Sequence, residues 1–165
     1  NMAVGDIVIA SHLIQFDVDL TAFGRRHGEL PDSNRIIESD PELVRIAGEA
    51  YDRAFPDTAD APGLMIGTVV SGDKFVKDSE TLRWLQREFA ALAAEMEGAA
   101  FGYTCHLNNL PFAVIRALSD SSGESASNDF EQNLHTACQN SFRVMDQMIP
   151  QAMCERNQQE RRQAN

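Results

Sequence analysis

Basic residues are scarce in this 165-residue sequence: 14 Lys and Arg stand against 25 Asp and Glu, and the formal net charge is -11. Such an acidic surface repels phosphate backbones, which argues against nucleic-acid partners. No apolar run approaches the roughly 18 residues of a membrane span, and no basic segment followed by an apolar one indicates a secretory signal. We therefore expect no membrane partner, and a cytoplasmic protein that handles neutral or cationic small molecules.

Cysteine is also rare. The three cysteines, Cys105, Cys138 and Cys154, are odd in number and far apart, whereas a disulfide framework or a zinc site requires closer spacing. The four histidines form no pair with metal-ligand spacing. The sequence therefore predicts thiols in a reducing compartment, no metal and no cofactor.

Apolar runs and helical periodicity alternate along the chain, whose length suits a single domain. Strands are expected at 5–11, 64–72 and 111–120. Helices are expected at 39–55, at 78–89, from the segment after "AEMEGAA" (94–100) to about 108, and at 129–149. Residues 16–36 and 56–63 are expected to be loops. This alternation predicts an α/β fold with mainly parallel strand pairing. We expect the domain to span 1–150 and to be followed by a polar C-terminal tail, 151–165, whose end frays.

The stretch "AEMEGAA" (94–100) places two acids directly before small residues in apolar surroundings. The small residues would allow a helix to pack closely on the sheet. The strand ends "SGDKF" (71–75) and "LSD" (118–120) are also polar, and open α/β sheets bind ligands outside the carboxyl ends of their strands. We therefore expect Glu97 to face a ligand; a solvated acid at a helix N-terminus is the alternative. Glu95 is expected to be such an acid or an ion-pair partner and, placed two residues away on a helix, to point away from Glu97.

Several stretches together carry a specific resemblance: "GDIVIAS", "FDVDLTAFGRRHGELP", "VVSGDKFV", "AEMEGAA" and "LPFAVIRALSD", with Phe130 ten residues beyond Asp120. In this order and spacing they resemble the bacterial 5′-methylthioadenosine/S-adenosylhomocysteine nucleosidases of the nucleoside phosphorylase superfamily. The resemblance implies a three-layer α/β/α fold with a mostly parallel central sheet. It also implies that this chain corresponds to the C-terminal two-thirds, without the N-terminal strands, a glycine-rich loop and the water-activating acid.

The resemblance implies hydrolysis of the N-glycosidic bond of 5′-substituted adenine nucleosides, namely 5′-methylthioadenosine, S-adenosylhomocysteine or 5′-deoxyadenosine. Adenine leaves well only when N7 is protonated, and a positioned carboxylic acid can supply that proton. Asp120 matches this general acid, and Ser119 could orient it. The remaining matches are Met96, Glu97 and Arg116 for the ribose, and Phe75, Val76 and Phe130 for the purine. A structural partner for one of the acids is the alternative for Arg116, and a place in the core is the alternative for Phe75.

Four further residues match a loop that reaches the 5′-substituent pocket of a neighbouring subunit: Leu20, Phe23, Arg25 and Pro31. This match implies a homodimer. The family usually has an aromatic residue where Arg25 stands. An exposed charged loop is the alternative. Two other functions stay open from the sequence: a related purine nucleoside phosphorylase, and a non-catalytic nucleoside-binding fragment. Without a matched water-activating acid, residues 1–165 alone are expected to be inactive.

Overall fold

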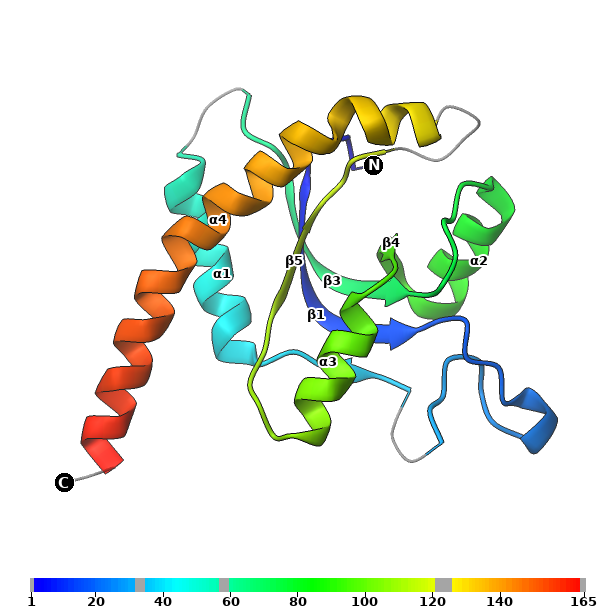
Figure 1. The fold of residues 1–165 in the computed structure, drawn as a ribbon, viewed down its shortest axis with the longest axis horizontal. Coiled ribbons are helices and arrows are strands. Elements are labelled where there is room, and N and C mark those ends of the chain that lie inside the picture. Colours follow the sequence, from blue (N-terminus) through cyan, green and yellow to red (C-terminus); the bar gives the residue numbers. More distant parts are fainter. Residues whose placement is uncertain (1, 32–34, 57–59, 121–125, 164–165) are drawn as a thin grey trace.

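The computed structural model of the protein describes residues 2–31, 35–56, 60–120 and 126–163. Along the chain, the described elements are a first strand and a short 3-10 turn, then alternating strands and helices, and a long C-terminal helix (Figure 1). Their bounds are β1 Ile7–Gln15, η1 Thr21–Phe23, β2 Ile37–Glu38, α1 Pro41–Ala54, β3 Leu64–Ser71, α2 Ser79–Phe89, β4 Ala91–Glu95, α3 Gly98–Leu107, β5 Val114–Ala117 and α4 Ala126–Gln163.

The strands form one mixed sheet in which β1 has three neighbours. β3 pairs with β1 in parallel along the whole of both strands, from Ile7 opposite Leu64 to Gln15 opposite Ser71. β4 continues the sheet in parallel beyond β3. On its other edge, β1 pairs antiparallel with β5 near its start and with β2 near its end. The α/β class with mostly parallel strands is confirmed.

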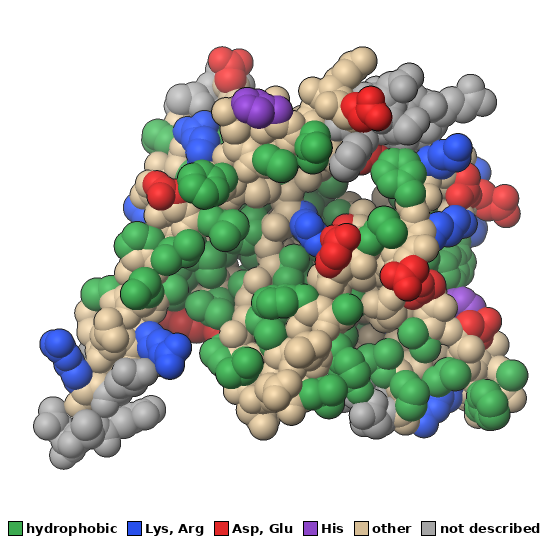
Figure 2. Space-filling view, in the orientation of Figure 1, with side chains coloured by type: hydrophobic (Ala, Val, Ile, Leu, Met, Phe, Trp, Pro, Cys, Tyr) green, Lys and Arg blue, Asp and Glu red, His purple; other side chains and the backbone are tan. Residues whose placement is uncertain are grey.

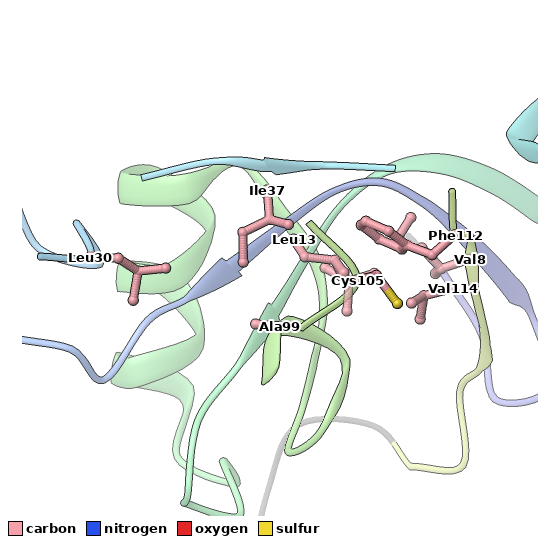
Figure 3. Packing of buried hydrophobic residues seen from close by; sticks show 10 residues of the cluster. Val8, Leu13, Leu30, Ile37, Ala99, Cys105, Phe112 and Val114 are labelled. Atoms are coloured by element: carbon pink, nitrogen blue, oxygen red, sulfur yellow. The ribbon is translucent and has the colours of Figure 1, made fainter. Parts of the chain in front are cut away.

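Alternate side chains of β1 point into separate layers, as the period of a strand requires. Val8, Ala10 and Leu13 pack with Ala99 and Cys105 of α3 (Figure 3). Ile7 and Ile9 point to the other face, where they pack against α1 and α4. A third cluster joins the end of β1 to α2. The three-layer arrangement therefore follows from the apolar side chains that β1 directs to both of its faces.

The two capped helices begin where the sequence supplies a side-chain acceptor. The Asp40 carboxylate accepts a hydrogen bond from the Leu43 amide at 2.9 Å, and Pro41 occupies the first turn of α1. The Asp78 carboxylate accepts from the Thr81 amide at 2.7 Å at the start of α2. Both caps satisfy amides that have no partner within their helix.

The structure differs from the sequence-based expectation in several places. Residues 91–95 form a strand, β4, that the short alanine-rich run did not reveal. β5 runs antiparallel to β1, so only β3 and β4 end as parallel strands at the expected edge. α4 continues as a helix through Gln163, where a frayed polar tail was expected. There it is held against α1, because Glu155 pairs with Arg45 at 2.9 Å and Gln151 donates to Glu49 at 2.7 Å.

Candidate active site

Glu95 is the centre of a hydrogen-bond cluster at the junction of β4 and α3. Its side chain is only 12% exposed. The carboxylate accepts from the Gly98 amide at 2.9 and 2.8 Å and from the Glu97 amide at 3.1 Å. It also accepts from the Ser71 hydroxyl and from the Arg116 guanidinium. These donors explain how an acid is tolerated in an apolar segment, since a buried carboxylate must be paired and hydrogen-bonded.

Arg116 bridges both acids of "AEMEGAA". Its Nη2 lies 2.9 Å from Glu97 Oε2 and also contacts Glu95. The expectation that Glu95 points away from Glu97 is therefore wrong, because Glu95 ends a strand and only Glu97 begins the helix. Glu97 is 72% exposed at its side chain, so its carboxylate can still accept hydrogen bonds from a ligand.

The small residues after the acids allow α3 to lie close against β1. Gly98, Ala99 and Gly102 are buried. A Cβ at Gly102 would lie only 2.6 Å from Leu13 Cδ1 and 3.0 Å from the Phe112 ring, closer than such atoms approach in proteins. The Ala99 amide also donates to Ser71 Oγ at 2.7 Å. This close packing places the N-terminus of α3, with Glu97, beside the ends of β3 and β4.

A second part of the predicted site is a hollow of about 610 Å³ next to β4 and α2. Asp120 and Val76 both line it, together with Leu118 and Met65. The Ser119 hydroxyl donates to Asp120 Oδ1 at 3.0 Å, as the orienting role predicted for Ser119 requires. The volume lies within the range of roughly 300–1,000 Å³ that is typical of small-molecule sites. Glu97 and Arg116 line a different hollow instead.

The other residues that match the family's motifs vary in how exposed they are. Phe75 and Met96 are exposed at 44% and 42%. Phe130 lies in α4, but its side chain is outside the described part of the chain. In the 16–31 loop, Phe23 is 82% exposed. Arg25 folds back on its own loop, since its guanidinium pairs with Glu29 at 3.0 Å and donates to the Pro31 carbonyl at 2.7 Å. Leu20 is half-buried and Pro31 is exposed.

Ser71 belongs to the hydrogen-bond cluster of the candidate site, and the sequence did not predict its role there. It is fully buried at the end of β3, and its hydroxyl joins Glu95 to the first turn of α3. A polar residue at the carboxyl end of a buried strand was the available signal. A third hollow, of about 1,410 Å³ and bordered by β2, contains none of the predicted site residues.

A family model described as the phosphorylase superfamily matches residues 1–150, so the chain belongs to that superfamily. Within it, the chain is similar to the 5′-methylthioadenosine/S-adenosylhomocysteine nucleosidase of Tolumonas auensis, with 35% identity over 151 residues that cover 91% of this chain and 64% of the relative.

Solved structures of nucleosidases are also similar to this chain. A nucleosidase from Neisseria meningitidis in complex with methylthio-immucillin-A matches with a TM-score of 0.83 and 36% identity, covering 90% of this chain and 63% of that one. A nucleosidase from Colwellia psychrerythraea in complex with adenine matches with a TM-score of 0.82 and 34% identity, covering 91% and 61%. The chain thus spans just under two-thirds of the length of these relatives, and the resemblance stated from the motifs is confirmed.

Two further features concern the residues that the structure describes. None of the helices placed by the structure is long and apolar enough to cross a membrane. Within the same residues, no group of three or more His, Cys, Asp or Glu side chains is arranged to hold a metal ion.

Proposed function

We propose that this protein hydrolyses the N-glycosidic bond of 5′-substituted adenine nucleosides, of the 5′-methylthioadenosine and S-adenosylhomocysteine type, and releases adenine. The observation that carries the proposal is that Asp120 lines a hollow of nucleoside size with Val76, and accepts a hydrogen bond from Ser119. The similarity to nucleosidases over about nine-tenths of the chain supports it.

In this proposal Asp120 donates its proton to N7 of the purine as the glycosidic bond breaks. Loss of the neutral base then leaves an oxocarbenium-like sugar; water bonds to its anomeric carbon and releases one proton, and exchange with solvent restores the proton on Asp120. General acid catalysis of this kind typically contributes about 10²–10⁴-fold to the rate. The Val76 backbone reads the adenine edge, and Phe75 and Phe130 stack on the ring.

Glu97, with Met96 beside it, binds the ribose hydroxyls in this proposal. Its exposed carboxylate has free acceptor capacity beyond the contact with Arg116. Arg116 holds Glu97 in place from β5. Glu95 is assigned a structural role, because its carboxylate already accepts from Ser71, Arg116 and two amides.

We further infer that the protein is a cytoplasmic homodimer. The exposed Phe23 and the loop around it are available to a neighbouring subunit. In the proposed dimer, Leu20, Phe23, Arg25 and Pro31 border the partner's 5′-substituent pocket. Widely spaced thiols suit a reducing compartment.

The test is a chimera in which the N-terminal third of the Tolumonas auensis relative precedes residue 2 of this chain. We expect this full-fold chimera to release adenine from 5′-methylthioadenosine at about 1 s⁻¹ or faster, a rate in the ordinary range for enzymes, and residues 1–165 alone to release none. Activity that is independent of phosphate indicates hydrolysis, whereas a strict phosphate requirement indicates a phosphorylase. A folded chimera that binds adenine without releasing it from the nucleoside would contradict the proposal.

A further inference from the structure

The segment that follows β3 carries two of the residues proposed to bind the purine. Phe75 and Val76 lie between the end of β3 and the start of α2, in a stretch that is neither helix nor strand. Val76 lines the hollow that Asp120 also lines, and Figure 2 shows an opening in the surface beside α2. Without a helix or strand to fix it, the position of this segment depends on individual contacts.

Backbone hydrogen bonds hold three successive amides of the segment. The Gly72 amide donates to the Glu95 carbonyl at 3.1 Å, and the Lys74 amide donates to the Gly72 carbonyl at 2.7 Å. Between them, the Asp73 amide donates to the Asp17 carboxylate at 2.8 Å. Of these three acceptors, only the Asp17 carboxylate belongs to a side chain, so a substitution can remove it without altering the backbone.

Asp17 is itself placed by the end of β1. Its carboxylate accepts a second hydrogen bond, from the side-chain amide of Gln15 at 2.7 Å. The next residue, Phe16, is buried, and its amide donates to the Ser71 carbonyl at 2.9 Å. The Phe16 ring also packs edge-on against Trp84 of α2, with 6.4 Å between the ring centroids. The Asp17 side chain is exposed, but it extends from a backbone that these contacts fix.

Gly72 allows the two segments to approach so closely. A Cβ at Gly72 would lie 2.6 Å from the Phe16 ring and 3.1 Å from Asp17 Cγ. Asp17 and Asp73, which are 56 positions apart in the sequence, therefore meet directly. A hydrogen bond from a backbone amide to a carboxylate is stronger than one between neutral groups. This contact can hold the segment in one position.

We propose that Asp17 is a positioning residue for purine recognition. Its carboxylate holds the Asp73 amide, and this contact fixes Phe75 and Val76 where the base binds. Asp17 acts through the backbone of Asp73 and need not touch the substrate. The inference rests on the proposed function, because it takes the base to be adenine bound beside Val76.

The experiment measures adenine binding by the full-fold chimera, and amide hydrogen exchange of its residues 73–76. Asp17→Ala should speed this exchange and weaken adenine binding about fivefold, since a hydrogen bond to a charged group is lost and water replaces it only in part. Asp17→Asn keeps a carbonyl oxygen for the Asp73 amide, so its affinity for adenine should stay within about twofold of the unmutated chimera.

Asp19→Ala is the matched control. Asp19 is an exposed acid two residues further along the same loop, and its carboxylate accepts from the Thr21 amide at 3.0 Å and lies 3.7 Å from His27. Both of these partners belong to its own loop. Adenine affinity and the exchange of residues 73–76 should therefore change by no more than about twofold in this variant.

A second ligand separates positioning from a general structural role. The affinity of Asp17→Ala for 5-methylthioribose, the sugar product of the proposed hydrolysis, should stay within about twofold, whereas a disturbed fold would weaken the binding of both products. Unchanged exchange at residues 73–76, an equal effect of Asp19→Ala, or an equal loss of affinity for both products would overturn the proposal. An unmutated chimera that binds no adenine would contradict the proposed function instead, and the exchange of residues 73–76 would still decide whether Asp17 holds the segment.

Discussion

Replacement of Glu95 by alanine tests the physical explanation of the acidic motif. The substitution removes the acceptor for the Ser71 hydroxyl, the Arg116 guanidinium and the amides of Glu97 and Gly98. The position is 12% exposed, so water replaces these contacts poorly. The first turn of α3 is then left with unsatisfied amides, and Arg116 loses one of its two acids.

The expected cost can be bounded from the contacts. Removal of one partner of a buried ion pair typically costs about 3–5 kcal/mol. Arg116 is 36% exposed and retains Glu97 at 2.9 Å, which favours the lower end, about 3 kcal/mol. Glu97→Ala is the control, because Glu97 is 72% exposed and an exposed ion pair contributes no more than about 1 kcal/mol.

Urea unfolding of the chain, followed by circular dichroism, measures both variants. With a slope of about 2 kcal/mol/M, Glu95→Ala should lower the midpoint by about 1.5 M and Glu97→Ala by about 0.5 M or less. Glu95→Gln should fall between them, since an amide keeps one acceptor oxygen but loses the charge. A Glu95→Ala midpoint no lower than that of Glu97→Ala would refute the assignment of Glu95 as the structural acid.

Two further predictions concern packing and pH. Gly102→Ala should destabilise the fold by about 1–3 kcal/mol, because the new Cβ would lie 2.6 Å from Leu13 Cδ1. Gly48→Ala in α1, where nothing lies within 4 Å of the new Cβ, should stabilise the fold by about 0.5–1 kcal/mol. Equal urea midpoints for the two variants would contradict this prediction. Hydrogen bonds from Arg45 hold the pKa of Glu42 at about 2, below its usual 4.5, and the Gln151 amide lowers the pKa of Glu49. The ionised Glu42 and Glu49 carboxylates stabilise the fold above their usual pKa, and this stabilisation is lost as the pH falls towards 2. The free energy of unfolding of a Glu42→Gln, Glu49→Gln variant should therefore fall less between pH 5 and pH 3 than that of the unmutated chain.

Much of the fold could be predicted from the sequence, because its signals were local. Asp40 and Pro41 indicate the start of α1, Asp78 that of α2, and the apolar run of β1 predicts burial on both faces. β4 was missed because alanine has no β preference, and its role depends on pairing with β3. The direction of β5 is also set by its partner strand and not by its own residues.

The sequence indicated which residue types make up the candidate site, but it did not indicate most of the contacts between them. Ser119 and Asp120, adjacent in sequence, are hydrogen-bonded as expected. Ser71 and Glu95 are 24 residues apart and meet only because β3 and β4 end together. The role of Glu95 could not be derived without knowing that a strand, and not a helix, carries it.

The rate of adenine release by an Asp120→Asn variant of the full-fold chimera tests the central claim most directly. Asparagine keeps the shape and the hydrogen bond to Ser119 but cannot protonate N7 of adenine. The account predicts that kcat for 5′-methylthioadenosine falls by about 10²-fold or more while circular dichroism and the urea midpoint stay the same. A folded Asp120→Asn chimera with near-normal kcat would contradict the account.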